Sequence, residues 1–405
     1  ENVRFSLNLF NLFLLPTTIN FIMQKYKIKV SIFVKNKFNY FLSPKWKINL
    51  SIMNTSKKIL VAPLNWGLGH ASRCIPVIYA IKENNFTPII ASDGASLHLL
   101  KKEFPNDIFE TLPDYNIQYA EKGEDFRFKI FKQLPKLFFA IRKEKKVLKE
   151  IIKKHAISGI ISDNRMGIFS TKIPSIYITH QVNILSGNTS WISSKFHQYF
   201  IKKFKECWVP DASESLNLSG RLSHENADLK NIKFIGPLTR FKKRNLAKKH
   251  NLLVVLSGPE PQRTLLEEKL CIELSEFKGS ILFVKGLIEN EQKITFQNNF
   301  TFYNYMEADE LEIAIQECEY IICRSGYSSI MDLAFLGAKA FLIPTPGQFE
   351  QEYLAKKLKK EGSVPSCAQH KFTLDKLQKI DIYSGFRTYN FNQDWTKLFA
   401  CFQGK

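Results

Sequence analysis

The stretch Cys323-Arg-Ser-Gly-Tyr-Ser-Ser-Ile-Met-Asp332, followed by Pro344-Thr-Pro-Gly-Gln-Phe-Glu-Gln-Glu352, decides the fold of this chain. It predicts a strand that stops at a small-residue turn and a helix that begins at Gly326 and Ser328. A second strand, Lys339 to Ile343, then ends in a Pro/Gly loop. Strands that alternate with helices in this way indicate an open α/β sheet.

The same stretch predicts the ligand. In an open α/β sheet ligands bind where strands end and helices begin, because free backbone N–H groups and the positive helix end favour anions there. We therefore predict a phosphate at this turn. Asp332, one to two turns inside the helix, can accept hydrogen bonds from a sugar diol, and Gln351 and Glu352 open the next helix with polar side chains. Together these features predict a nucleotide sugar.

Composition indicates a globular protein of two domains. A chain of 405 residues exceeds the size of about 250–300 residues at which single cores stop growing. The net charge is +20, which favours anionic partners such as nucleotide diphosphates or acidic lipid surfaces. Seven cysteines without a C-x-x-C pair or His pairs at metal spacing indicate a reducing cytosol and no metal site. We expect a cytoplasmic protein.

Residues 1–57 differ from the rest in composition. They hold nine Lys and Arg against one acid, with no Gly and no Asp. We expect an extension that is not native or is disordered, the true start being Met53 or, as a weaker choice, Met23. The rival is a membrane anchor, but the apolar run from Leu7 to Met23 is broken by Asn and Pro, which a span of about 20 apolar residues does not favour.

Two alternating series of strands and helices follow, which predicts two doubly wound Rossmann-like domains facing a cleft. We place the N-terminal domain at 58–236, a linker at 237–250, the C-terminal domain at 251–385 and a closing helix at 386–405. The strands predicted in the first domain are Ile59–Pro63, Pro88–Ser92, Gly159–Ser162, Ser175–Thr179, Cys207–Pro210 and Ile232–Ile235. Those predicted in the second are Leu252–Leu256, Ile281–Lys285, Phe300–Tyr303, Tyr320–Cys323 and Lys339–Ile343.

The first strand leads into the loop Gly67-Leu-Gly69-His70. Its two glycines allow close approach of a ligand and present His70 at the end of the sheet. An imidazole titrates near neutral pH, so His70 can act as a general base toward an acceptor hydroxyl; the alternative is a helix cap. The loop lacks the third Gly and the Lys of phosphate-binding fingerprints, so we expect the nucleotide to bind elsewhere.

Two further strands of the first domain end in polar residues, at Asp163 and at His180. The carboxyl ends of parallel strands share one edge, so both should flank His70. Asp163 can orient the imidazole and stabilise its charge, or it can cap a helix. His180 is an acceptor-side candidate, and a structural role is its alternative.

In the second domain the loop that begins at Ser257 and Gly258 follows a strand and opens a helix whose first turn holds Arg263. An Arg at a positive helix end needs an anion to compensate it, which favours a diphosphate contact over a plain surface position. Arg324, beside the turn, also has two interpretations: it contacts the diphosphate, or it has a purely structural role.

A basic helix is expected from Phe126 to Lys154, with eleven Lys and Arg against two Glu and an interleaved apolar stripe. One interpretation is a solvated helix packed on the core. The other is a membrane-surface patch, which would suit a lipid-borne acceptor and a position on the inner face of the membrane.

The two halves together resemble a GT-B glycosyltransferase, in particular the family of the bacterial N-acetylglucosaminyltransferase that makes lipid II and of the plant galactolipid synthases. The likeness covers roughly residues 58 to 365 and is most specific at Arg324-x-Gly326 and Asp332, where the family usually has Glu. The phrases Asn-Trp-Gly-Leu-Gly-His and Gly-Pro-Glu-Pro-Gln-Arg are similar to an uncharacterised bacterial branch.

The resemblance implies an inverting, metal-independent transfer from a UDP-sugar to an acceptor hydroxyl, lipid-linked or in a cell-envelope glycan. No cofactor is implied, since the UDP-sugar is a substrate. His70 and Asp163 would be catalytic, and Gly67, Gly69 and His180 would lie on the acceptor side. The implied donor-binding residues are Ser257, Gly258, Arg263, Met306, Arg324, Ser325, Gly326, Ser328, Asp332, Gln351 and Glu352.

Two rival functions stay open. A UDP-sugar 2-epimerase would use the same two-domain cleft without an acceptor, but it needs several catalytic carboxylates that the first half does not offer. A nucleic-acid binder would use the positive charge, but the chain carries no recognised nucleic-acid motif.

Overall fold

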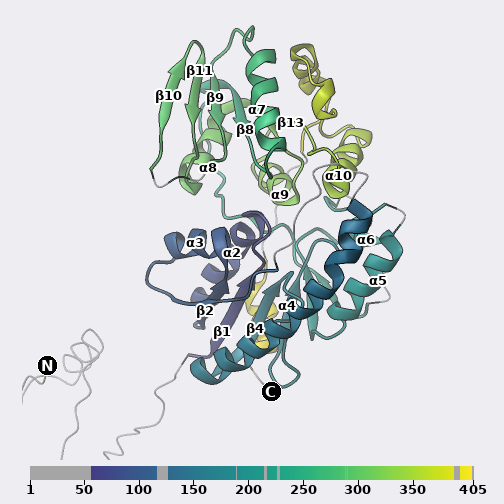
Figure 1. The fold of residues 1–405 in the computed structure, drawn as a ribbon. Helices are drawn as coiled ribbons and strands as arrows, with labels where there is room; N and C mark the ends of the chain where they lie inside the picture. Colours follow the sequence, from purple (N-terminus) through teal and green to yellow (C-terminus); the bar gives the residue numbers. More distant parts are fainter. Residues whose placement is uncertain are drawn as a thin grey trace, which may run out of the picture. The chain divides into compact units, whose positions relative to one another are not determined.

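The computed structural model describes residues 56–115, 126–187, 189–213, 217–225, 229–287, 289, 291–386 and 393–403, with the backbone alone for 126–135. The expectations about residues 1–55 lie outside the described residues. Residues 56–405 form one compact unit, which contains two sheets (Figure 1).

The first sheet has seven strands in the order β3-β2-β1-β4-β5-β6-β7, and every neighbouring pair is parallel. We call this sheet with its helices the N-lobe. Its strands are β1 (Lys58–Pro63), β2 (Thr87–Ser92), β3 (Ile108–Thr111), β4 (Ile157–Asp163), β5 (Ser175–Ile178), β6 (Glu206–Val209) and β7 (Ile232–Phe234). Its helices are α2 (Gly69–Glu83), α3 (Gly94–Glu103), α4 (Phe126–His155), α5 (Ser190–Ile201) and α6 (Arg221–His224).

The second sheet has six strands in the order β10-β11-β9-β8-β12-β13, of which only the β10–β11 pair is antiparallel among the described residues. We call it with its helices the C-lobe. Its strands are β8 (His250–Val255), β9 (Ile281–Val284), β10 (Ile294–Gln297), β11 (Phe300–Tyr303), β12 (Cys318–Cys323) and β13 (Ala340–Leu342). Its helices are α7 (Gln262–Glu273), α8 (Ala308–Glu317), α9 (Tyr327–Leu336) and α10 (Phe349–Lys360), with 3-10 turns η3 (Gln369–Lys371) and η4 (Leu374–Ile382).

Both lobes are doubly wound because buried side chains cover both faces of each sheet. In the C-lobe one core lies under α8, α9 and α10, and a separate core lies under α7 and η4. Each of the central strands β1, β4, β8 and β12 contains a run of buried apolar residues, such as Leu252, Leu253 and Val254 in β8, as expected for strands covered on both faces. This confirms the predicted two-domain α/β architecture.

The sequence patterns missed two strands, β3 and β10, and both are edge strands. All four residues of β10 are exposed, and β3 has no fully buried residue. An edge strand needs no continuous apolar run, so the signal used for the central strands is absent there.

The closing helix is α11 (Trp395–Gln403), drawn in yellow beside the N-lobe sheet (Figure 1). Its Phe399 and Phe402 are buried in the core that α2 shares with β1. A Cβ on Gly159 of β4 would lie 2.4 Å from the Phe402 ring, so this glycine makes room for the helix. The last turns of the chain therefore complete the core of the first lobe.

Candidate active site

His70 and Asp163 meet at the centre of the N-lobe sheet. β1 and β4 are neighbours with Pro63 opposite Asp163, and the chain order reverses between them, which is where ligands bind in open α/β sheets. α2 begins at Gly69, so His70 stands in its first turn. The His70 Nδ1 lies 2.9 Å from Asp163 Oδ1.

Arg73, which the sequence patterns did not single out, organises this pair. One turn after His70 on α2, it donates from Nε to Asp163 Oδ2 at 2.6 Å and from Nη2 to Asp163 Oδ1. Asp163 is fully buried and Arg73 is 2% exposed. Burial alone would raise the pKa of Asp163, but Arg73 and then His70 outweigh it and hold that pKa well below its usual range.

The geometry assigns the protons of His70. The Arg73 Nη2 also lies 2.8 Å from His70 Nδ1, but a bare Nδ1 would set its lone pair against the Asp163 carboxylate. The proton therefore belongs on Nδ1, donated to Asp163, and Nε2 keeps its lone pair. Burial, with the charge of Arg73, lowers the pKa of His70. His70 is thus a neutral imidazole at neutral pH, and no partner for its Nε2 is found within the described residues.

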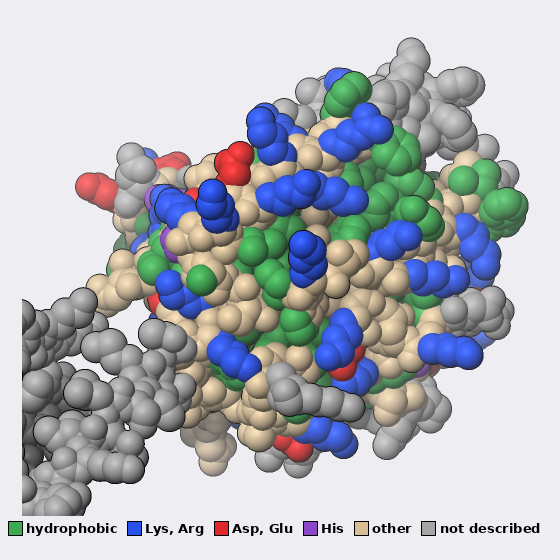
Figure 2. Space-filling model, turned by 90° about the horizontal axis from the view of Figure 1, so that it is seen from below, with side chains coloured by type: hydrophobic (Ala, Val, Ile, Leu, Met, Phe, Trp, Pro, Cys, Tyr) green, Lys and Arg blue, Asp and Glu red, His purple; other side chains and the backbone are tan. Residues whose placement is uncertain are grey.

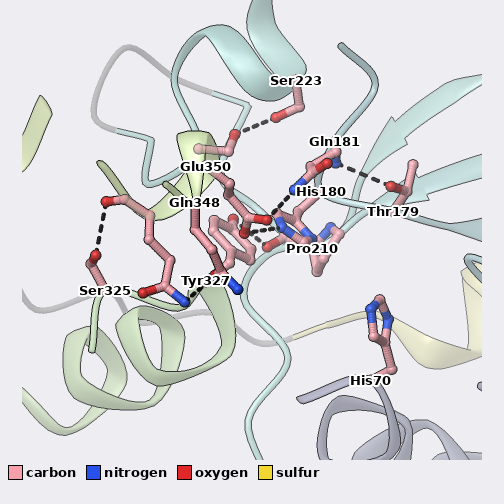
Figure 3. A network of polar contacts seen from close by, with 12 residues as sticks. His70, Thr179, His180, Gln181, Pro210, Ser223, Ser325, Tyr327, Gln348 and Glu350 are labelled. Atoms are coloured by element: carbon pink, nitrogen blue, oxygen red, sulfur yellow. Dashed lines mark hydrogen bonds and ion pairs between the residues drawn. The ribbon is translucent and has the colours of Figure 1, made fainter. Parts of the chain in front are cut away.

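His180 connects this cluster to the C-lobe. Its Nδ1 accepts from Arg73 Nη1 at 2.9 Å, and its Nε2 lies 2.8 Å from the Glu350 Oε1 at the start of α10. Its ring stacks on Tyr327 with centroids 4.2 Å apart, and the Tyr327 hydroxyl donates to the carbonyl of Pro210. Figure 3 shows Glu350 and Tyr327 from the C-lobe gathered around His180. Neither C-lobe residue was among the predicted site residues.

The glycine loop touches the C-lobe as well. Gly67 has a φ of 73°, in the region that glycine favours. A Cβ on Gly69 would lie 2.5 Å from the Ser328 Oγ of α9. The first turns of α2 and α9 therefore pack directly on each other, which places His70 beside the helix that carries Asp332.

The C-lobe repeats the arrangement of the N-lobe. β8 and β12 are neighbours, with Val255 opposite Cys323, so the loop of Ser257 and Gly258 lies beside the turn that contains Ser325 and Gly326. Gly258 has a φ of 106°. The chain order reverses between these strands too, so the predicted phosphate turn lies at the ligand-binding point of this sheet.

Arg324 is buried beneath that turn. Its guanidinium donates to the carbonyls of Ile343, Pro344 and Gln262, and within the described part of the chain no carboxylate pairs with it. Burial lowers its pKa to about 10. The Arg324 Nε and the Thr345 Oγ1 are both buried without a partner in the described residues. An uncompensated positive charge at this strand end favours an anion.

Arg263 does not need an external anion. Its Nε donates to Glu260 at 2.5 Å and its Nη1 to Glu267 at 2.6 Å. These carboxylates of the same chain compensate the charge at the helix start, so the sequence argument for a diphosphate at Arg263 loses its basis.

The other predicted donor residues shape the loop and helices around this turn. Asp332 accepts from the Thr239 hydroxyl at 2.6 Å, and burial raises its pKa to about 6 despite that bond and the nearby Arg240. The Gln351 Oε1 accepts from the backbone of Thr345 at 2.9 Å.

Three further donor candidates lie in the same region. Glu352 accepts from the backbone N–H of Gly347 at 2.9 Å, and the Ser325 hydroxyl donates to the carbonyl of Gln351. Met306, before α8, packs against the C-lobe core. The polar groups of Glu352 and Ser325 therefore order the chain around the turn.

Known proteins resemble this chain in sequence and in fold. Residues 253–381 match the glycosyltransferase family 28 C-terminal domain. Over 217 residues the chain is 24% identical to the UDP-N-acetylglucosamine–N-acetylmuramyl-(pentapeptide) pyrophosphoryl-undecaprenol N-acetylglucosamine transferase of Baumannia cicadellinicola subsp. Homalodisca coagulata. That match covers 52% of this chain and about half the length of the relative, 56%.

Solved structures extend the likeness to both lobes. The glycotransferase of kitacinnamycin superposes with a TM-score of 0.59 at 12% identity, over 81% of this chain and 91% of that one. The spinosyn rhamnosyltransferase SpnG, complexed with thymidine diphosphate, superposes with a TM-score of 0.54 at 13% identity. The superposition covers 81% of this chain and 93% of that one.

Fold and site define a GT-B protein. The match of its C-lobe to family 28 and the transferase relative support a glycosyltransferase, and the predicted GT-B fold is confirmed. Within that class the chain resembles the family of the lipid II-forming transferase, as its sequence motifs predicted.

Proposed function

We propose that this protein is an inverting, metal-independent glycosyltransferase that moves a sugar from a UDP-sugar to an acceptor hydroxyl. The observation that carries the proposal is the His70–Asp163–Arg73 cluster, whose neutral imidazole has no partner for its Nε2 among the described residues. It stands where α2 packs on α9, so a base of one lobe adjoins the anion-favouring turn of the other.

The reaction follows from these groups. His70 Nε2 takes the proton of the acceptor hydroxyl, and the acceptor oxygen forms a bond to the anomeric carbon as the bond from that carbon to the diphosphate oxygen breaks. The leaving electron pair goes to the diphosphate, which backbone N–H groups at the start of α9 and the charge of Arg324 stabilise. Asp163 holds the imidazolium that forms. One displacement inverts the anomeric centre.

Asp332 is proposed to hold the ribose hydroxyls, and its pKa of about 6 gives a test. Only the ionised carboxylate accepts two hydrogen bonds, so UDP should bind more weakly as the pH falls through about 6. Asp332→Asn should bind UDP about tenfold more weakly near neutral pH, as expected for lost charge-assisted bonds, and without that pH dependence. Isothermal titration calorimetry between pH 5 and 8 measures both. The terminal phosphate of UDP titrates in the same range, with a pKa of about 6, so the comparison with the wild type decides. A pH dependence as steep in Asp332→Asn as in the wild type would remove Asp332 from ribose binding.

The function itself is tested by a screen of UDP-, GDP- and dTDP-sugars with the chain starting at Met53. A thermal shift and slow hydrolysis with UDP-sugars are expected, because solvent water can replace a missing acceptor. If no nucleotide sugar stabilises the protein, the proposal fails. Conversion of a UDP-sugar to its epimer without an acceptor would instead favour the 2-epimerase.

A lipid-borne acceptor and a peripheral position on an anionic membrane are proposed from the surface of α4 and α5. Phe138 of α4 packs edge-on against Phe196 of α5, so the two helices present one face. These helices expose Phe138, Phe139, Trp191, Ile192 and Tyr199, together with Lys136, Arg142, Lys143 and Lys195. Figure 2 shows a face of the molecule on which Lys and Arg surround hydrophobic side chains with few acids. No helix in the described ranges is long and apolar enough to span a bilayer.

Vesicle flotation tests this surface. Trp191→Glu should lower binding to vesicles rich in anionic phospholipid at least fivefold, because a charge replaces an inserting aromatic ring. Ile272→Glu, an equally exposed apolar site on α7 of the other lobe, is the matched control. Equal binding of both variants and the wild type would contradict a membrane role for this face.

A further inference from the structure

A continuous row of polar contacts runs from the C-lobe to His70. Glu350 of α10 contacts His180 at 2.8 Å, and His180 contacts Arg73 at 2.9 Å. Arg73 binds both oxygens of Asp163, and Asp163 contacts His70 at 2.9 Å. Four of these side chains belong to the N-lobe, and Glu350 alone comes from the C-lobe. Figure 3 shows the contact between Glu350 and His180.

The contact with Arg73 assigns the proton of His180. Arginine has no acceptor, so the contact from Arg73 requires a bare Nδ1 on His180. The proton of His180 then lies on Nε2 and is donated to Glu350. Gln181 also donates to Glu350, which fixes the orientation of the carboxylate. Glu350 therefore sets the tautomer of His180, and through it the direction of one arm of the Arg73 guanidinium.

The ring of His180 has little freedom to adjust. It lies parallel to Tyr327, with an angle of 4° between the two planes, and it is 6% exposed. A rotation of the ring would break the stacking and both hydrogen bonds together. The row is thus a stiff connection between α10 and Arg73.

Glu350 also acts through its charge. The groups that face His70 are Arg73 on its own helix, Asp163 on β4 and His180 after β5, and Glu350 interacts with His70 from α10. Burial opposes the ionisation of Glu350, but His180, His70 and Arg73 together lower its pKa. An ionised Glu350 favours a proton on His70, which makes the imidazole a stronger base.

We propose that Glu350 is a positioning residue for His70, one that fixes His180 and Arg73 from the opposite lobe so that the imidazole is held in the orientation needed to accept a proton. The inference rests on the proposed function, in which His70 is the base. It adds to that function a C-lobe residue that does not contact the reacting atoms. Glu350 acts on His70 through three intervening side chains, those of His180, Arg73 and Asp163.

The first test needs no substrate. Histidine side chains labelled with ¹⁵N are titrated by NMR in the wild type and in Glu350→Gln. We expect the pKa of His70 to be lower in the variant, because an anion is lost while Arg73 remains. A structural loosening would instead admit water and move that pKa up toward its ordinary value. An upward shift or an unchanged titration would overturn the proposal.

The second test uses turnover. Glu350→Gln should lower kcat about tenfold, because His70 becomes a weaker base, and should leave KM for the donor within twofold. In the pH profile of kcat/KM, the acidic limb should move to lower pH. Glu350→Asp, which keeps the charge, should return the acidic limb toward its wild-type position. Glu361→Gln, at the far end of α10 where Glu361 pairs with Lys357, should match the wild type.

The outcomes distinguish a failure of the positioning role of Glu350 from a failure of the proposed function. A rise in KM alone would make Glu350 a donor ligand and would overturn its role as a positioning residue. If the wild type turns over no nucleotide sugar, the proposed function fails, while the NMR titration still decides whether Glu350 controls His70.

Discussion

His70→Ala is expected to lower kcat by about 10²–10⁴-fold, the usual contribution of a general base, while the affinity for UDP stays within threefold. The reason is the separation of roles between the lobes. His70 stands in the first turn of α2 in the N-lobe with its Nε2 unengaged in the described structure, whereas the predicted diphosphate turn lies in the C-lobe. Steady-state kinetics and calorimetry with UDP measure the two quantities.

His98→Ala is the matched control, because His98 is exposed on α3 of the same lobe, and it should behave as the wild type. Added imidazole should restore part of the activity of His70→Ala, since the removed ring leaves room for it. Unchanged kcat would remove His70 from the mechanism. A large loss of UDP affinity would show that His70 is a donor ligand instead.

Arg73→Met is expected to lower the free energy of unfolding by about 3–5 kcal/mol, the cost of leaving one partner of a buried ion pair uncompensated. Asp163 is fully buried and receives both Arg73 donors, so no solvent screens the lost interaction. Urea denaturation measures the loss. Lys154→Met, which breaks the surface pair with Glu110, should cost less than about 1 kcal/mol.

The pH dependence of this effect has a definite sign. In the wild type the depressed pKa of Asp163 contributes stability above the unfolded value of about 3.9, and that stability is lost as the pH falls below it. Without Arg73, burial raises the pKa, so folding then favours the protonated acid. The deficit of Arg73→Met should therefore be smaller at pH 5 than at pH 8.

A double variant separates charge from packing. Arg73→Met combined with Asp163→Asn removes both charges and should recover at least half of the stability lost in the single variant. A double variant as unstable as the single one would show that Arg73 acts through its packing and not through Asp163.

The sequence was sufficient to predict the lobes and the meeting of His70 with Asp163. Both follow from one rule, because the carboxyl ends of neighbouring parallel strands share an edge and the polar residues after β1 and β4 stand out against apolar strands. The turn after β12 was predictable for the same reason. Arg73 was not, although it lies three residues after His70 on one helix face, because an Arg on an amphipathic helix usually faces solvent.

Glu350 was missed for a different reason. The sequence pattern indicated the polar pair Gln351 and Glu352 as donor residues. Successive residues of a helix, however, point about 100° apart. Which of them faces the other lobe depends on where α10 begins, and it begins at Phe349. A boundary shifted by a residue or two is the usual error of sequence-based prediction, and here it changes which carboxylate reaches His180.

The placement of α11 affects the order in which the protein can be assembled. Phe399 and Phe402 fill space between β1 and α2, yet in the chain they follow the whole second domain. During synthesis the core of the first domain therefore stays incomplete, with an apolar gap in its interior, until the whole second domain and α11 have emerged. A fragment that ends after β7 would keep that gap permanently and expose it to aggregation.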